Sequence, residues 1–558
     1  MSRRSLAHIP SASTTDFPAA APVRSAQSPA SERTSFGPWL SARNFYLGLI
    51  VVALAVGAFS LLIPSTPSYD PWSWLVWGRE IIHLNLKTTG GPTWKPLPVI
   101  FTTVFALFGK AQPDLWLVVA RAGAFATVVM VFRLSARFTR QIGAYFSSPT
   151  AGGNRTLAWL PALLAGVVAA LGVAFSGGYI SNNALGYSEG LATAVVLIAL
   201  ERHLDGHPRQ AFAAGFLAAL DRPEIWLFWG PYGLWLFWKD PEARKLVVAL
   251  FVLIPILWFA PEYWGSGHFF RGVSRAQHVR SNSNALAKCP FCAELTKAAW
   301  PTVLLRVKVL AALLIIGAAL THGRRWLGER RFTLRDAPSR ALAIAALAGV
   351  VGLSWWVLIS ILTQAGFSGN NRYLVIGSSL VDICGGVAWG LAACALGALL
   401  ARVLRLGPAD GTSAGSEAGR VVGVLVTAAV VLLLSPNLVT QDLNVLPRTH
   451  RALVYQAHLR NGAASLVRRY GRRQLLACGS VMTEGFQVPM VAWTLDVHTD
   501  QVLGPPPAGL PPGTAPNVIL QTRASRNLAL LPFLSQWPTV HYHYVGHSGP
   551  FRLFTHCV

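Results

Sequence analysis

Residues 67–114 read PSYDPWSWLVWGREIIHLNLKTTGGPTWKPLPVIFTTVFALFGKAQPD and follow the first long apolar run of the chain. The stretch holds too many tryptophans and prolines for a helix that crosses a bilayer, and it is too apolar for an ordinary loop. The Gly-Gly-Pro break at 90–92 divides it into two predicted helices, at about 71–84 and 96–108. We predict that both helices lie on the outer membrane surface, so that 65–114 is one large outer loop.

The composition indicates a polytopic α-helical membrane protein. Of the 558 residues, 53% are hydrophobic and only 13% are charged, which is far from the balance of a soluble domain. The net charge of +24 would suggest nucleic acid in a soluble protein, but the arginines stand mostly between apolar runs, where membrane topology accounts for them. We therefore predict contact with membrane lipids and no nucleic acid partner. Residues 1–43 are rich in Ser, Pro and Ala, which predicts a disordered cytoplasmic tail rather than a secretory signal.

The apolar runs predict a membrane domain at 44–436 with about eleven spanning helices. The candidate runs are 45–64, 115–136, 158–176, 186–203, 210–221, 223–238, 246–260, 300–321, 340–363, 373–403 and 421–436. With this count, all the strong arginine clusters but one fall on the side of the N-terminus, which is then cytoplasmic. If 95–109 crossed the membrane as well, every later loop would be inverted, which is why we place that segment on the surface.

The exception to the positive-inside rule is the outer loop 261–299. It carries Arg271, Arg275, Arg280 and Lys288 on the face that should be poor in basic residues. Two explanations are open. The loop binds an anionic ligand, or it is one of the longer loops that escape the rule.

The composition changes at about residue 437, where the apolar runs shorten. We predict that 437–558 forms a small soluble domain of mixed α/β structure on the extracytoplasmic side. Its expected elements are a helix at about 447–469 and strands in "RQLLACGSVM" and "PNVILQT".

The six cysteines fall into three pairs by location. The pairs are Cys289 and Cys292 in the outer loop, Cys478 and Cys557 in the C-terminal domain, and Cys384 and Cys394 inside a predicted span. We expect disulfides at the first two pairs, because both lie on the oxidising side. The "CPFC" motif can also be a redox centre or half of a zinc site, but no second CxxC or adjacent histidine pair completes four ligands. No metal ligand set is therefore predicted.

Asp70 is the candidate general base. It follows the first span directly and precedes Pro71. An aspartate before proline is often the N-cap of a helix, because its carboxylate accepts the free amide groups of the first turn. A purely structural role is thus the competing interpretation. The position of Asp70 at the outer membrane surface, where other ionisable groups converge, favours a functional role.

Further charged groups are predicted on the same face. Glu189 begins a span, Asp221, Arg222 and Glu224 lie between two half-length spans, Asn371 and Arg372 open another, and Lys95, Arg121, His268 and Arg271 add positive charge. An unpaired charge at membrane depth costs on the order of 2.5–3.5 kcal/mol, so such groups usually pair or line a cavity. A structural network of Arg222 with its acidic neighbours and an interface anchor at Arg372 are the competing interpretations.

One base with a surplus of cations fits the displacement of a phosphate leaving group by a hydroxyl. The carboxylate takes the hydroxyl proton, and arginine and lysine stabilise the charge on the departing phosphate. A lipid-linked sugar phosphate is a donor that would meet such a site from the bilayer.

The order of these residues resembles the GT-C class of integral-membrane glycosyltransferases, especially its branch of lipid A aminoarabinose transferases and protein O-mannosyltransferases. The resemblance covers most of 45–380 and rests on Asp70, Lys95-Pro96, "FALFGK", Arg121-Ala122, "SEG" at 188–190, "DRPE" at 221–224 and "NNRYLV" at 370–375. It implies an inverting enzyme in which Asp70 activates the acceptor, Lys95 and Arg372 contact the lipid phosphate, and Glu189, Arg222 and Glu224 line the sugar or lipid cavity. Many relatives carry two adjacent acids where this chain has "YDP", so no cofactor is predicted and a divalent metal stays an open alternative.

We therefore predict a glycosyltransferase that moves a sugar from a polyprenyl-phosphate donor to a glycan, lipid or protein acceptor of the cell envelope, on the outer face of a bacterial cytoplasmic membrane. The Arg-, Ala- and Gly-rich, Lys-poor composition suggests an actinobacterial source and decaprenyl-phosphate arabinose or mannose as the donor. Two other classes are open: a transporter or flippase for a lipid-linked sugar, and a non-catalytic envelope-assembly protein.

Overall fold

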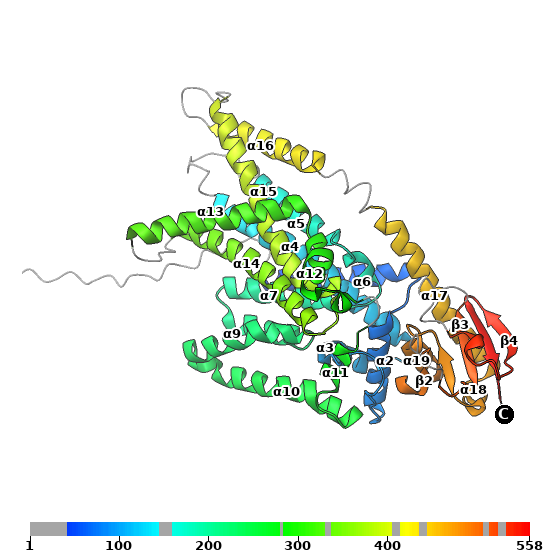
Figure 1. The fold of residues 1–558 in the computed structure, drawn as a ribbon. Coiled ribbons are helices and arrows are strands. Elements are labelled where there is room, and N and C mark those ends of the chain that lie inside the picture. Colours follow the sequence, from blue (N-terminus) through cyan, green and yellow to red (C-terminus); the bar gives the residue numbers. More distant parts are fainter. Residues whose placement is uncertain are drawn as a thin grey trace, which may run out of the picture. The chain divides into compact units, whose positions relative to one another are not determined.

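The computed structural model describes residues 42–143, 159–279, 283–329, 336–403, 413–434, 443–505, 513–522 and 532–557. The chain divides into two compact units, Met1–Gly48 and Leu49–Val558, and the second contains every candidate site residue. Nearly all of the predicted tail 1–43 lies outside the described residues. The described part is mostly helical, with a small sheet of five strands in its C-terminal region (Figure 1).

Helices occupy all of the ranges that were expected to span the membrane. Their bounds are Ala42–Phe59 (α1), Gln112–Gly143 (α4), Leu160–Ala174 (α5), Glu189–Leu204 (α7), Pro208–Ala219 (α8), Trp226–Lys239 (α9), Arg244–Ser266 (α10), Leu305–Glu329 (α13), Ala337–Gln364 (α14), Val375–Val403 (α15) and Ser413–Leu433 (α16). In the described part of the chain, six helices with their adjoining turns are long and apolar enough to cross a membrane: Ala42–Leu62, Gly109–Gly143, Pro241–Ser266, Leu305–Arg324, Ala337–Gln364 and Asn371–Val403. The count of about eleven crossings and their direction stay predictions.

The opening loop forms the two short helices that its sequence predicts. They are Tyr69–Ile82 (α2) and Pro96–Ala106 (α3), and α3 begins at a proline, which fits the first turn of a helix. Helix α2 buries Trp72, Trp74 and Trp77, whereas α3 exposes Ile100 and Val104. Short helices further along the chain are Tyr179–Ala184 (α6), Arg271–Gln277 (α11) and Pro290–Ala293 (α12), the last followed by a π-helical turn at Glu294–Ala299.

Helices α4 and α7 approach each other closely because each presents a glycine to the other. A Cβ atom on Gly123 of α4 would lie 2.5 Å from the Cα atom of Leu191, and one on Gly190 of α7 would lie 2.9 Å from the Cα atom of Ala124. Small residues at such crossings allow backbones to pack in direct contact. This packing fixes the N-terminus of α7, where Glu189 lies.

The C-terminal region combines three helices with the sheet. Its helices are Val445–Tyr470 (α17), Arg472–Cys478 (α18) and Val488–Leu495 (α19), and its strands are Val481–Thr483 (β1), Val502–Leu503 (β2), Val518–Thr522 (β3), His543–Ser548 (β4) and Phe551–Thr555 (β5). The strand order is β2-β1-β3-β5-β4, with β1 parallel to both of its neighbours and β5 antiparallel to both of its own. The first predicted strand is wrong in part: most of "RQLLACGSVM" forms α18, and the chain becomes extended only after Gly479, whose φ of 131° suits glycine.

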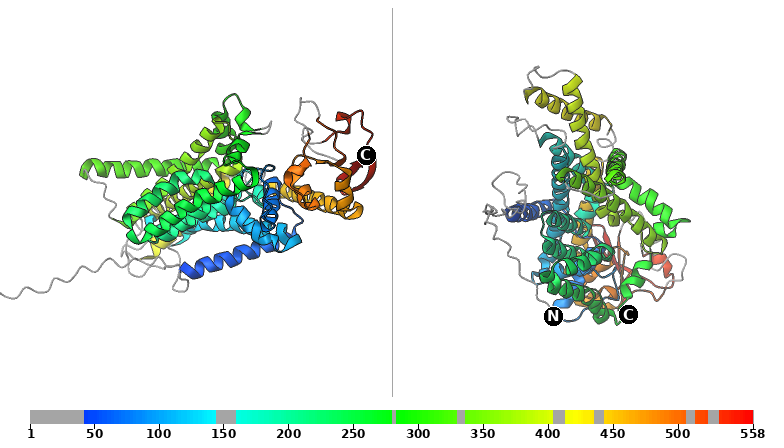
Figure 2. Two further views of the ribbon diagram at one scale, coloured as in Figure 1. Left: turned by 90° about the horizontal axis from the view of Figure 1, so that it is seen from below. Right: turned by 90° about the vertical axis from the view of Figure 1, so that its left-hand side faces the viewer.

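The C-terminal region packs on the opening loop through α19 and α2. The rings of Trp72 and Trp493 lie 5.3 Å apart, and the indole nitrogen of Trp493 donates to the side chain of Gln112 at 2.8 Å. Figure 1 shows α19 and β2 beside α2, and the views in Figure 2 keep the orange C-terminal helices next to the blue opening loop. The loop that carries Asp70 and Lys95 is therefore covered by a part of the chain some 400 residues away in sequence.

The glycine contact between α4 and α7 predicts a selective loss of stability. We expect Gly123→Ala to destabilise the protein by about 1–3 kcal/mol, because the added methyl group meets backbone atoms that cannot move aside. The measurement is the unfolding temperature of the detergent-solubilised protein. Gly317→Ala in α13 is the matched control, since its new Cβ would meet nothing within 4 Å. Equal unfolding temperatures for the two variants would contradict the prediction.

Candidate functional site

Asp70 and Arg372 form an ion pair at the centre of the candidate site. Asp70 lies in the first turn of α2, and its carboxylate accepts a hydrogen bond from Nη2 of Arg372 at 2.6 Å. The alternative that Asp70 is the N-cap of α2 is wrong, because Ser68 occupies that position. Arg372 comes from the turn Asn371–Leu374 that leads into α15. The two residues stand 302 positions apart in the sequence and meet only in the folded chain.

Glu189 is the acid that the cations of the site share. It is the first residue of α7, where the helix dipole favours a negative charge, and only 4% of it is exposed. Its Oε1 atom lies 3.2 Å from Nζ of Lys95, 3.6 Å from Nη1 of Arg222 and 3.9 Å from Nε of Arg372. Lys95 also donates to the hydroxyl group of Ser188 at 3.2 Å. One buried carboxylate thus holds together cations from three distant segments.

The "DRPE" turn between α8 and α9 completes the charged cluster. Asp221 lies 3.8 Å from Nζ of Lys95, and Arg222 donates to Glu224 at 2.9 Å. The local network that was considered as an alternative for Arg222 is therefore present, but the same guanidinium also faces Glu189. The three charged side chains of this turn are largely buried.

Two tyrosines that the sequence analysis did not single out support the arginines. The guanidinium carbon of Arg372 lies 4.0 Å from the ring centre of Tyr187, and that of Arg222 lies 4.1 Å from the ring centre of Tyr373. Cations over aromatic rings gain electrostatic stabilisation, and a planar guanidinium stacks better than an ammonium group. The positions of Tyr187, directly before "SEG", and of Tyr373, directly after Arg372, were the available signals.

Four residues predicted to bind substrate lie outside this cluster. Arg121 donates to the carbonyl oxygen of Ala184 at 2.6 Å and to the hydroxyl groups of Ser60 and Ser65, both at 2.8 Å. The side chain of Asn371 donates to the carbonyl oxygen of Gly177 at 2.8 Å. His268 follows the end of α10 and is exposed. The fourth, Arg271, has its own set of partners.

Arg271 binds the opening loop instead of the charged cluster. Its two terminal nitrogens donate to the carbonyl oxygens of Thr89, Gly90, Gly91 and Pro92 at 2.8–3.3 Å. Burial lowers the pKa of the Arg271 guanidinium, although nearby Glu262 opposes the shift. The basic side chain thus satisfies backbone carbonyls of the opening loop rather than standing free.

The cluster does not carry the surplus of positive charge that the sequence analysis expected. Its members are the acids Asp70, Glu189, Asp221 and Glu224 and the bases Lys95, Arg222 and Arg372. The expectation was wrong because it counted Arg121, His268 and Arg271, which lie elsewhere. Arg372 is already paired with Asp70, so an incoming anion has to compete with that carboxylate for the guanidinium group.

Both expected disulfides form, one in the segment between α11 and α13 and one in the C-terminal region. Cys289 is bonded to Cys292 and Cys478 to Cys557, whereas Cys384 and Cys394 are free thiols in α15. The first disulfide begins the α12 segment, where the backbone N–H of Phe291 donates to the side chain of Gln364 at the end of α14. The disulfide loop thus contacts the segment that leads to Arg372.

No metal site is evident in the ranges that the structure describes. Within them, no group of three or more His, Cys, Asp and Glu side chains is arranged to hold an ion. Each acid of the charged cluster faces Lys95, Arg222 or Arg372.

Comparison with known proteins identifies similar structures but no family model. No family model matches the chain, and no curated protein is similar to it in sequence. Two solved structures of ArnT from Cupriavidus metallidurans are similar: the form bound to undecaprenyl phosphate, at 14% identity and a TM-score of 0.48, and the apo state, at 15% identity and a TM-score of 0.47. Each alignment covers 92% of this chain and 98% of the other. ArnT is a GT-C glycosyltransferase, the class that the sequence motifs resemble. At these values the similarity assigns neither a function nor a site residue to this chain.

The position of Glu189 predicts a strong dependence of stability on its charge. We expect Glu189→Gln to destabilise the protein by about 3–5 kcal/mol, because it leaves Lys95, Arg222 and Arg372 buried without their shared partner. The unfolding temperature in detergent is the measurement. Glu242→Gln serves as the control, since Glu242 pairs with Arg209 at the exposed surface and its loss should give no measurable shift. A shift of the same size in both variants would argue against a shared buried partner.

Proposed function

We propose that the chain is a GT-C type glycosyltransferase that moves a sugar from a polyprenyl-phosphate donor to an envelope acceptor on the outer face of the membrane. The observation that supports the proposal is the ion pair between Asp70 and Arg372 at 2.6 Å. Asp70 is the candidate base, and Arg372 is the candidate phosphate-binding residue. Arg372 lies at the start of the apolar helix Asn371–Val403, where a lipid phosphate in the bilayer would approach it. Arginine, with lysine beside it, is the residue that binds phosphate best.

The pairing of each cation in the cluster with a carboxylate decides how the donor would bind. A phosphate adds negative charge, so binding requires one carboxylate to release its cation. Asp70 is the best candidate, because it is the acid paired with Arg372 at 2.6 Å and 16% of its side chain is exposed, compared with 14% for Glu224, 5% for Glu189 and none for Asp221. In this mechanism the donor phosphate takes the place of Asp70 at Arg372 and also contacts Lys95. Donor binding thereby frees the carboxylate that the reaction needs.

The freed carboxylate then acts as the general base. Asp70 takes the proton of the acceptor hydroxyl group, the acceptor oxygen bonds to the anomeric carbon, and the bond from that carbon to the phosphate oxygen breaks. The electron pair leaves with the phosphate oxygen, whose growing charge Arg372 and Lys95 stabilise. The products are a glycosylated acceptor with inverted configuration and free polyprenyl phosphate. For the donor, we favour decaprenyl-phosphate arabinose or mannose on the compositional argument given above.

Asp70→Asn should separate binding from chemistry. We expect the variant to bind undecaprenyl phosphate at least as tightly as the native protein, because a neutral amide at this position no longer competes as a charged partner of Arg372. Turnover of a polyprenyl-phosphate sugar should fall at least about a hundredfold, because the general base is lost. The measurements are lipid binding by native mass spectrometry and release of free polyprenyl phosphate by the purified protein.

Asp114→Asn is the matched control for this experiment. Asp114 also lies in the first turn of a helix and also pairs with an arginine, Arg460, at 2.7 Å, but it lies outside the charged cluster. It should leave both measurements unchanged. Full turnover in Asp70→Asn would remove Asp70 as the base, and weaker lipid binding would contradict the competition for Arg372. Movement of the intact donor across proteoliposomes, without release of polyprenyl phosphate, would favour a flippase.

A further inference from the structure

Lys95 stands at the end of a segment that has no regular secondary structure of its own. The segment runs from residue 85 to residue 95 and joins α2 to α3. Backbone groups outside helices and strands need partners from elsewhere in the chain. Here the backbone N–H of Lys87 donates to the carboxylate of Glu80 at 2.9 Å, and that of Thr88 donates to the carbonyl oxygen of Gly265 at 3.0 Å. The conformation of the segment is therefore imposed by its surroundings.

The outer loop after α10 holds one side of this segment. Arg271 accounts for four consecutive carbonyl groups, and Nε of Arg275 donates to the carbonyl oxygen of Gly91 at 2.9 Å. Trp94 adds a further anchor, because its indole nitrogen donates to the carbonyl oxygen of Leu257 in α10 at 3.0 Å. These contacts fix the backbone up to the residue before Lys95.

Asp500 of the C-terminal region holds the opposite side. Its Oδ2 atom accepts a hydrogen bond from the hydroxyl group of Thr89 at 2.6 Å and lies 3.0 Å from Nζ of Lys87. Gly90 packs on the same point, since a Cβ atom there would lie 2.8 Å from the backbone nitrogen of Asp500. Burial raises the pKa of Asp500, but the hydrogen bonds from Thr89 and Lys87 outweigh burial, and the pKa lies below its usual value. The carboxylate is thus charged wherever the protein is active near neutral pH.

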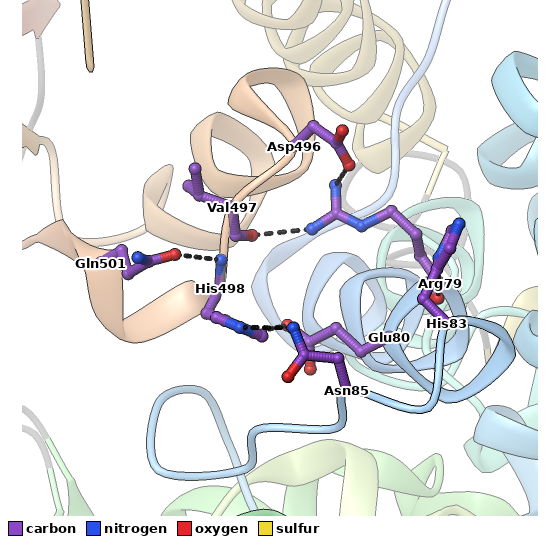
Figure 3. A pocket seen from close by; sticks show the side chains of 8 residues that line it. All are labelled: Arg79, Glu80, His83, Asn85, Asp496, Val497, His498 and Gln501. Carbon is purple, nitrogen blue, oxygen red and sulfur yellow. Dashed lines mark hydrogen bonds and ion pairs between the residues drawn. The ribbon is translucent and has the colours of Figure 1, made fainter. Parts of the chain in front are cut away.

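A polar cavity of about 210 Å³ lies at the same junction, next to the Asp500 contact (Figure 3). Its walls come from the end of α2 and from the turn after α19. Across it, Arg79 bonds to Asp496 at 3.0 Å and to the carbonyl oxygen of Val497 at 2.7 Å, and His498 bonds to Glu80 at 2.7 Å. These side chains bind one another across the cavity, as the dashed lines in Figure 3 show, so the junction has the character of a docking contact rather than of a ligand site.

We propose that Asp500 is a positioning residue for Lys95, so that docking of the C-terminal region sets the affinity of the site for the donor phosphate. Asp500 and Arg271 both form hydrogen bonds to the 85–95 segment, and Lys95 follows directly after the residues that these bonds and Trp94 hold in place. Loss of the contact with Asp500 lets the segment move, and Lys95 then moves away from Glu189 and Asp221. The inference rests on the proposed function, in which Lys95 contacts the donor phosphate.

The test measures the dissociation constant of undecaprenyl phosphate for the full-length protein in detergent. We expect Asp500→Ala to weaken binding about tenfold, as the loss of a charge-assisted hydrogen bond predicts. The KM for a polyprenyl-phosphate sugar should rise by a similar factor. The kcat should be nearly unchanged, because the substitution at Asp500 leaves the general base Asp70 in place. Asp500→Glu keeps the charge and should restore part of the affinity. Thr89→Val removes the same hydrogen bond from the other partner and should weaken binding in the same direction.

Arg460→Ala is the matched control. Arg460 also joins the C-terminal region to the helical part, through Asp114, but it does not touch the 85–95 segment. Unchanged donor affinity in Arg460→Ala, with an unfolding temperature as low as that of Asp500→Ala, would support positioning rather than general loosening. Equal losses of affinity in both variants would overturn the inference.

Lys95→Met separates the two proposals. If Lys95→Met leaves binding of undecaprenyl phosphate unchanged, the assignment of Lys95 in the proposed function fails. If Lys95→Met weakens binding but Asp500→Ala and Thr89→Val do not, the proposed function stands and the positioning role of Asp500 is wrong.

Discussion

The need to neutralise Glu189 in a buried position organises this part of the molecule. A carboxylate at the membrane boundary is costly unless cations surround it, and each of the three cations around Glu189 arrives from a different part of the chain. Lys95 is the residue before α3, Arg222 comes from the turn between α8 and α9, and Arg372 comes from the start of α15. Glycines on α4 and α7 bring the helix that carries Glu189 to a fixed place. Electrostatics and helix packing therefore specify the same arrangement.

A cluster in which each cation is paired with a carboxylate is stable in the absence of ligand and can still respond to one. If every cation stood free, the site would repel itself, and if every acid were inaccessible, no anion could enter. The side chains of Asp70 and Arg372 are more exposed than those of the other ion pairs in the cluster. An anionic ligand can therefore replace Asp70 at Arg372. The same bond that stabilises the empty site would then keep the base unreactive until the donor arrives.

Sequence reasoning located the helices well because apolar runs and proline or glycine breaks are local signals. It also selected Asp70, Lys95, Glu189, Arg222 and Arg372, since charges at the ends of apolar runs are rare and stand out. It wrongly grouped Arg121 and Arg271 with the cluster, because the partner of a guanidinium depends on which distant backbone folds against it. The junction at Asp500 was not foreseen, since a single aspartate in a polar stretch carries no local pattern. The parallel pairing of β1 was missed because its partners, β2 and β3, are remote in sequence. The helical start of "RQLLACGSVM" was missed as well.

The sheet order has a consequence for how the molecule matures during synthesis. Strand β5 lies between β3 and β4, so the sheet cannot close until residue 555 has left the ribosome. The 85–95 segment is synthesised far earlier. It lacks its contact with Asp500 until the C-terminal region has been synthesised and has folded. A chain whose synthesis stops short of β5 would lack the strand that joins β3 to β4, and the Asp500 turn, which leads directly into β2, would rest on an incomplete sheet.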